Sequence, residues 1–203
     1  MEKEKISESY SYCYEDRFLI EDYEKRHLHI NGVIDENVID TIVYHILRYN
    51  MIDKGVKRDK RKPIILYLNS PGGSVTDGFG VIDAILQSET PVYTVNLATC
   101  YSMGFLIFLS GEKRFGMPNS TYLCHDGSSL AYDSMSKLKD RMEFETGQME
   151  QHTKNYILSR TSISEKLYNK KYRTEWYMYP DEAKTYDVVT HIVGTDCSIY
   201  DIL

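Results

Sequence analysis

The sequence contains no apolar run of about 18 residues, which is the length that a membrane-spanning helix needs. Its first residues, MEKEKISESYSYCYEDR, are polar and partly acidic and lack the apolar stretch of a secretion signal. We therefore expect a cytoplasmic protein with no membrane partner.

Cysteine is scarce, with four residues in a chain of 203 and no CxxC pair. This scatter favours neither a metal site nor a disulfide framework, and it is typical of reduced thiols in the cytosol. Excess positive charge is also missing, because the formal net charge is −6. The charge gives no electrostatic reason to expect nucleic acid as a partner. The one basic run, residues 54–62, is interrupted by Asp59 and is typical of a solvated loop.

The chain is long enough for one domain with a substantial core. Continuous or alternating apolar runs predict strands, and stretches with helical spacing between them predict helices. We expect strands at residues 26–32, 63–70, 91–98, 120–125 and 187–193. We expect helices within 33–50, with Asp35 as the N-cap, and at 74–88, 102–111, 132–160, 164–171 and from 180. This alternation indicates an α/β fold with a largely parallel sheet.

Two of the predicted strand-to-helix turns carry residues suited to chemistry. In NSPGGSV, Gly72 and Gly73 allow a tight bend that leaves backbone amides uncovered. In YSMG, Ser102 lies at a predicted helix N-terminus. A structural serine there would cap the helix, and a catalytic serine there would act as a nucleophile. Active sites of α/β sheets form where strands end. Brought together, these turns would place Ser102 beside the N–H groups of Gly73 and Met103, which is an oxyanion hole in outline.

A serine nucleophile also needs a base. His125 is the candidate, because it ends the predicted strand 120–125. The remaining histidines lie within predicted strands or helices: His27, His29, His45, His152 and His191. Taken singly, each candidate also has a common structural interpretation, as a helix cap, a turn or a polar surface residue.

Four ordered motifs resemble one family. LYLNSPGGSVTDG resembles its Asn-Ser-Pro-Gly-Gly segment, and YSMG resembles its Ala-Ser-Met-Gly nucleophile turn. KRFGMPNSTYLCH and YPDEAKTYDVV resemble its Lys-Arg…Leu-Pro-Asn…His block and its Pro-Glu-Ala…Tyr-Gly-Leu-Val ending. Over residues of about 24–195, the chain is therefore similar to the ClpP family, the proteolytic subunits of the Clp protease.

The resemblance implies a single domain over residues 1–203, with an N-terminal segment at 1–22 and a handle region at about 126–160. The fold would be α/β, a ClpP/crotonase-like spiral of repeated β-β-α units with a protruding handle helix. Heptameric rings would pair through the handles into a tetradecamer with the serines inside. An AAA+ Clp ATPase would deliver unfolded polypeptides as substrates, and Tyr67 matches an aromatic position of the family's docking pockets. No cofactor and no metal are implied.

The resemblance also implies the roles of the site residues. Ser102 would be the nucleophile, His125 the general base, and the Gly73 and Met103 amides the oxyanion hole. The family's acid is an aspartate in an Arg-Asp pair, and an ungapped alignment on the EA of PDEA sets Thr174 and Glu175 at that pair. Glu175 is the expected third member of the triad. Two further carboxylates are rivals for that place: Asp126 and Asp181.

Further departures concern the nucleophile turn and assembly. Tyr101 replaces a small alanine, and its phenol either packs into the core or narrows the substrate groove. Thr174 replaces an arginine that contacts the opposite ring in the family, and HDG at 125–127 replaces His-Gln-Pro; both bear on assembly.

The sequence thus predicts a serine endopeptidase that an imperfect acid makes slow rather than inactive. The alternatives are a non-catalytic ring subunit on the same fold and, ranked lower, a crotonase-like acyl-CoA enzyme.

Overall fold

The computed structural model describes residues 14–127 and 134–203, and its centre is a seven-stranded sheet. The strand order is β1-β2-β3-β4-β7, and β5 pairs with both β3 and β6. Every pairing of these strands is parallel except β5 with β6. The strands are β1 (His27–Asn31), β2 (Ile64–Ser70), β3 (Val92–Tyr101), β4 (Lys113–Gly116), β5 (Thr121–Cys124), β6 (Trp176–Met178) and β7 (His191–Ile192). The predicted α/β class is confirmed.

Helices alternate with these strands along the chain. The α-helices are α1 (Tyr14–Lys25), α2 (Tyr44–Ile52), α3 (Val75–Leu86), α4 (Met103–Ser110), α5 (Met135–Glu143), α6 (Glu150–Arg160), α7 (Glu165–Lys171) and α8 (Pro180–Thr185). Two π-helical segments, η1 (Ile39–Val43) and η3 (Phe144–Met149), and two 3₁₀ turns, η2 (Arg58–Lys60) and η4 (Ile199–Ile202), join or follow them.

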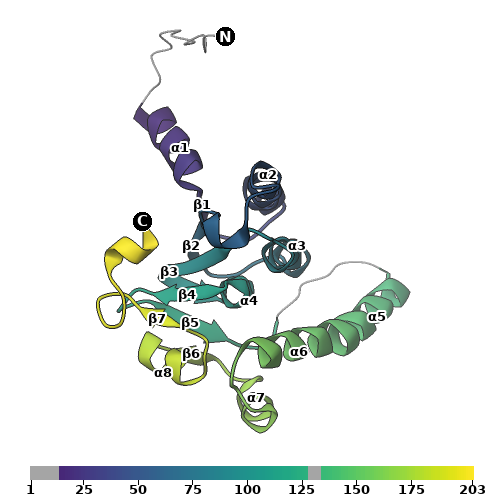
Figure 1. Ribbon diagram of the computed structural model, residues 1–203. Helices are drawn as coiled ribbons and strands as arrows, with labels where there is room; N and C mark the ends of the chain where they lie inside the picture. The colour runs from purple at the N-terminus through teal and green to yellow at the C-terminus, as the bar shows by residue number, and fades with distance from the viewer. Residues whose placement is uncertain (1–13, 128–133) are drawn as a thin grey trace, which may run out of the picture.

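Strand β2 separates two apolar layers. Ile64, Leu66 and Leu68 pack in the main core with α2, α3 and α4, whereas Ile65 and Tyr67 face a smaller cluster on the other side. Figure 1 shows those three helices on one side of the strands and the C-terminal segment on the other. A strand that is buried on both faces explains the continuous apolar run of residues 64–68.

Helix α4 is buried along its whole length, from Met103 to Ser110. A helix that is apolar all round belongs inside a core rather than on a surface. Because its N-terminus follows β3 directly, α4 fixes the position of Ser102.

The segments α5, η3 and α6 form one long helical projection away from the sheet (Figure 1). Its inner end is tied to α4, because the Tyr156 hydroxyl donates to the Leu106 carbonyl and Arg160 Nε donates to the Leu109 carbonyl, both at 3.0 Å. No side chain of α5 is buried. The helix expected at 132–160 is observed from Met135 onward, and residues 128–133 of the expected handle region lie outside the described residues.

Several sequence-based boundaries were wrong. Strands β4 and β6 were not expected, since both are short and each is defined mainly by its pairing partner. The last strand covers two residues instead of 187–193, because the preceding residues belong to the turn that ends α8: Asp187 has a positive φ of 56°, and the Val188 amide donates to the Ala183 carbonyl at 3.0 Å.

Two further observations concern the N-terminal half. The helical stretch begins at Asn37, before η1, and the Asp35 carboxylate accepts a hydrogen bond from the Asn37 backbone N–H at 3.0 Å, which is the contact expected of an N-cap. Helix α1 was not expected in the N-terminal segment, whose first residues, 1–13, lie outside the described part. Within the described ranges, no helix combines the length and apolar character needed to cross a membrane.

Candidate active site

Ser102 occupies the sharp turn between β3 and α4. Its φ and ψ of 53° and −119° are strained for a residue with a side chain. Its amide donates to the Leu123 carbonyl at 3.0 Å, which ties the turn to β5. The side chain makes no capping hydrogen bond, whereas Ser74 and Ser164 cap α3 and α7 with theirs. The structural interpretation of Ser102 as a helix cap is therefore wrong, and its hydroxyl remains available.

The double-glycine turn after β2 lies against this serine. A Cβ on Gly72 would stand 2.7 Å from Ser102 Cβ and 3.2 Å from the Met103 nitrogen. A Cβ on Gly73 would stand 2.1 Å from the Ile34 carbonyl oxygen. Both glycines have positive φ, at 106° and 148°. Only glycine permits this conformation at such close range.

Two backbone amides near Ser102 are uncovered. Within the described residues, neither the Gly73 nor the Met103 N–H has a hydrogen-bond partner. Both residues line the same cavity as Ser102. The Met103 amide also belongs to the first turn of α4, where the helix dipole favours negative charge. The two amides are thus free to receive an oxygen of a bound ligand.

His125 and Glu175 meet because of strand register. In β5 and β6, Cys124 lies opposite Trp176, so the next positions beyond the ladder are His125 and Glu175. His125 Nδ1 lies 3.0 Å from Glu175 Oε1. The imidazole is mostly buried, with 20% of the side chain exposed, but the Glu175 side chain is 58% exposed.

The two rival carboxylates do not contact the imidazole in the described structure. Asp126 lines the cavity, and its backbone N–H donates to the Tyr172 carbonyl at 2.9 Å. Asp181 lies exposed in the first turn of α8. Glu175 is the carboxylate that the fold brings to His125.

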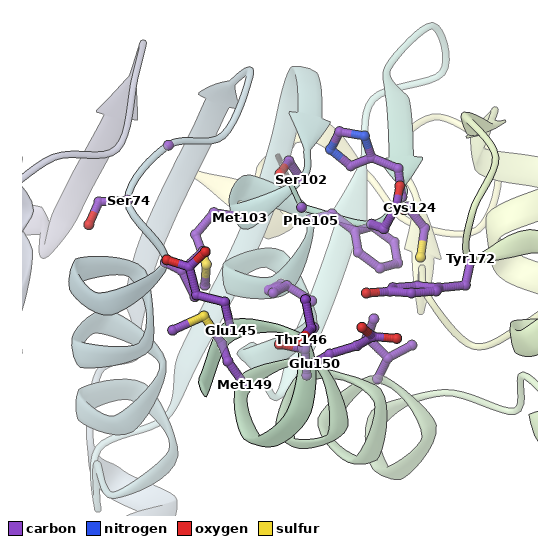
Figure 2. Close-up of a pocket in the computed structure, with 18 of the residues that line it drawn as sticks. Ser74, Ser102, Met103, Phe105, Cys124, Glu145, Thr146, Met149, Glu150 and Tyr172 are labelled. Atoms are coloured by element: carbon purple, nitrogen blue, oxygen red, sulfur yellow. The ribbon is translucent and has the colours of Figure 1, made fainter. Parts of the chain in front are cut away.

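The cavity, of about 630 Å³, lies between the two turns and the inner part of the helical projection. Figure 2 shows Ser102 on one side and Glu145, Thr146, Met149 and Glu150 on the other. Ser102 and His125 both line it, although no hydrogen bond joins them within the described residues. Catalytic contacts of this kind are often long before substrate binds.

The handle side of the cavity was missed by the sequence analysis. Residues spaced three or four apart on the helix line it, and that spacing is the signal that could have found them: Thr146, Met149, Glu150, Thr153 and Ile157. The methionines of the same helical projection are divided between two environments. Met149 lines the cavity, whereas Met135 and Met142 are exposed.

Cys124 is a second potential nucleophile beside the cavity. Burial raises the pKa of its thiol to about 12, so it stays protonated at neutral pH and unreactive. Ser102, whose side chain makes no capping hydrogen bond, remains the candidate nucleophile of this cavity. Across the two described ranges, no cluster of three or more histidine, cysteine or acidic side chains is arranged to hold a metal ion.

Tyr101 does not line the cavity. Its hydroxyl lies 2.7 Å from Thr121 Oγ1, and its ring packs edge-on against Tyr177 with a centroid distance of 5.6 Å. The side chain is half-buried on the surface of β5 and β6. In this chain it therefore neither enters the core nor narrows this cavity.

Tyr67 lies on the opposite side of the sheet and is only 8% exposed. Its ring stacks on His29 at 5.2 Å, and its hydroxyl donates to the carbonyl of Ile202 in the C-terminal turn η4. Within the single chain, this expected docking residue is thus covered by the C-terminal segment.

Comparisons with known proteins identify the family of this chain. The family model described as Clp protease matches residues 15–196. The chain is 27% identical over 197 residues to ATP-dependent Clp protease proteolytic subunit 2 of Treponema pallidum, covering 95% of this chain and 92% of that protein. These matches span nearly all of the sequence, including both turns, His125 and Glu175. The chain therefore belongs to the Clp protease family.

Proposed function

We propose that this chain is the peptidase subunit of a self-compartmentalising serine endopeptidase. Ser102 attacks the peptide carbonyl, His125 takes the hydroxyl proton and then donates it to the leaving amine, and water hydrolyses the acyl-enzyme. One observation carries this proposal. His125 contacts Glu175 beside a cavity that Ser102 also lines, and the Ser102 hydroxyl is not used to cap helix α4.

The orientation of the imidazole has a chemical consequence. A carboxylate beside Nδ1 accepts a hydrogen bond from the tautomer that carries its proton on Nδ1. This tautomer leaves Nε2 as the basic nitrogen. When the imidazole becomes charged during attack, Glu175 stabilises it. The tetrahedral oxyanion would be bound by the Gly73 and Met103 amides, which have no partner of their own within the described residues.

Glu175 is a less rigid acid than an aspartate would be. It has one more rotatable bond than aspartate, and 58% of its side chain is exposed. Loss of a properly held acid costs up to about 10⁴-fold in turnover. We therefore expect a slow enzyme whose rate depends on how firmly Glu175 is held.

The assembly is part of the same proposal. Heptameric rings stack into a tetradecamer through the helical projection, and an AAA+ Clp ATPase supplies unfolded polypeptides in the cytoplasm. Large apolar side chains that are exposed along the projection support a contact there, namely Met135, Met142 and Phe144. The free buried thiols of Cys100 and Cys124 suit a reducing compartment.

A fluorophosphonate probe tests the chemistry. Purified protein should be labelled, and the Ser102→Ala variant should not. Light scattering on the same samples should give the mass of a tetradecamer. Absence of labelling in a correctly assembled barrel would contradict the peptidase and favour the second candidate, a non-catalytic ring subunit. The high exposure of Glu175 and the missing hydrogen bond between Ser102 and His125 are the observations that favour that candidate within the described residues.

A further inference from the structure

One carboxylate of the cavity has no part in the chemistry proposed above. Glu150 begins α6, where the helical projection passes the cavity, and it lines the cavity together with Ser102. The residue is half-buried, and within the described part of the chain its side chain makes no hydrogen bond and no ion pair. A carboxylate that is partly removed from water without a counter-charge is costly to keep ionised. It therefore marks a place where a positively charged group would be stabilised.

The other charged groups of the cavity do not compensate Glu150. Arg141 Nε donates to Glu145 Oε1 at 2.6 Å, so these two charges balance each other. Arg173 and Asp126 are exposed lining residues of opposite sign, and among the described residues no ion pair joins Arg173 to Glu150. Two arginines and three carboxylates thus line the cavity, and with a neutral imidazole its formal charge is −1.

The walls around this carboxylate are apolar. Phe105 and Leu106 of α4 and Ile157 of α6 are buried side chains that line the same cavity. The Met103 amide, which would bind the oxyanion, belongs to the first turn of α4. The side chain of the residue whose carbonyl is attacked is therefore the one nearest to Phe105 and Leu106. A side chain bound there meets apolar walls and, on the side of the helical projection, a carboxylate (Figure 2).

We propose that Glu150 makes the cavity selective for lysine or arginine at the residue whose carbonyl Ser102 attacks. This inference rests on the proposed peptidase function. The methylene stem of such a side chain packs against Phe105 and Ile157, and its cationic end pairs with Glu150. An apolar side chain of the same length would bury the carboxylate without a partner, which costs binding free energy. Selectivity comes from the pair that a basic residue forms and from the unpaired charge that an apolar residue leaves.

Steady-state hydrolysis of two fluorogenic peptide amides tests the inference. The peptides differ only in the residue that supplies the scissile carbonyl, which is lysine in one and norleucine, a lysine without its ammonium group, in the other. We expect kcat/KM for the lysine peptide to be higher by about tenfold or more, as for one charged hydrogen bond in a partly buried site. An equal or higher kcat/KM for the norleucine peptide would overturn the selectivity.

Two substitutions assign the preference to this carboxylate. Glu150→Gln keeps the size of the side chain and removes its charge, so kcat/KM should fall for the lysine peptide and rise for the norleucine peptide; the rise shows that the variant is folded. Glu150→Lys should make a glutamate peptide a better substrate than the lysine peptide. Glu143→Gln is the matched control, because Glu143 is exposed on α5 outside the cavity, and its preference should equal that of the wild type. Equal changes on both peptides in Glu150→Gln would overturn the role of Glu150.

The fluorophosphonate probe separates this inference from the proposed function, because the probe carries no amino-acid side chain. Wild-type protein that is labelled at Ser102 but cleaves the lysine and norleucine peptides equally well would overturn the selectivity alone. Protein that is neither labelled nor active on either peptide would overturn both the peptidase function and the selectivity.

Discussion

At the scale of single residues, Ser102 shows how the fold stores strain at a reactive position. A side chain at φ of 53° and ψ of −119° costs on the order of 1–3 kcal/mol, which the buried helix α4 and the tie to β5 must offset. Strain of this kind exposes the hydroxyl instead of letting it fold back as a cap.

This strain predicts a difference between two inactive variants. Ser102→Gly relieves the positive φ, whereas Ser102→Ala keeps it, so the glycine variant should be more stable by about 1 kcal/mol. Urea unfolding of both at the same protein concentration measures the difference. An alanine variant that is the more stable of the two would contradict the claim of strain.

Glu175 predicts a graded loss of activity. Glu175→Gln should lower kcat by between about 10² and 10⁴, because an amide cannot stabilise the charged imidazole. Asp126→Asn, which changes the carboxylate next to His125 in sequence, should lower it far less. Initial rates of peptide hydrolysis compare the two, and the opposite ranking would transfer the acid's role to Asp126.

The residues of the site were predictable to different degrees. Ser102 and His125 were found because they follow predicted strands and match ordered motifs, and Glu175 was found by alignment. The contact between His125 and Glu175 could be inferred from that alignment alone, because it depends on the antiparallel pairing of β5 with β6. No local sequence pattern specified that pairing.

At the scale of elements, an ion pair joins the start of β1 to the end of α2. The Arg26 guanidinium donates to both carboxylate oxygens of Asp53, at 2.6 and 2.7 Å, and the Thr90 hydroxyl adds a third bond. The two charged side chains are only 12% and 6% exposed. The hydrogen bond from Arg26 holds the pKa of Asp53 below its ordinary value.

The lowered pKa of Asp53 fixes the sign of a pH dependence. The stability that the ionised carboxylate contributes is fully present above its unfolded pKa of about 3.9, and is lost as pH falls through the lower folded value. Asp53→Asn should therefore lower the free energy of unfolding at pH 7 by about 3 kcal/mol. The variant should also lose less further stability than the wild type when the pH falls below about 4. Thermal unfolding of both proteins at pH 7 and pH 3 measures this, and parallel curves would contradict it.

The C-terminal turn η4 closes the second apolar layer. Ile202 packs with Ile65, Tyr67 and Val95, and its carbonyl accepts a hydrogen bond from the Tyr67 hydroxyl. Deleting residues 199–203 should expose this layer and increase the fluorescence of an apolar dye in the folded protein. The double change Ile199→Ala and Tyr200→Ala is the matched control, since both side chains are exposed and their loss should leave the fluorescence unchanged. An unchanged signal after the deletion would show that other groups cover Tyr67.

The elements themselves were predictable where burial dictates a pattern. Strand β2 and helices α3 and α4 were predicted to within about two residues of their ends, because turn residues bound their apolar runs. Strand β4 begins with Lys113 and Arg114 and gives no such pattern. Its arginine is buried only because carbonyls of distant residues, including Val188, accept its N–H groups.

At the scale of the whole molecule, the exposed apolar side chains of the handle indicate a surface that a single chain leaves uncovered. Met142 is 62% exposed on α5, where no side chain is buried. In the proposed barrel, Met142→Lys should separate the two rings and halve the mass measured by light scattering. Lys139 is an exposed residue of the same helix, so Lys139→Glu serves as the control for a change of surface charge. A full-sized barrel in the Met142→Lys variant would place the ring contact elsewhere.

The central claim is that Ser102, His125 and two open amides act together on a carbonyl. A crystal structure of the fluorophosphonate adduct tests it most directly. The account predicts a phosphonyl group on Ser102, with its oxygen about 2.7–3.1 Å from the Gly73 and Met103 nitrogens and His125 beside it. An adduct on another residue, or a phosphonyl oxygen directed away from both amides, would contradict it.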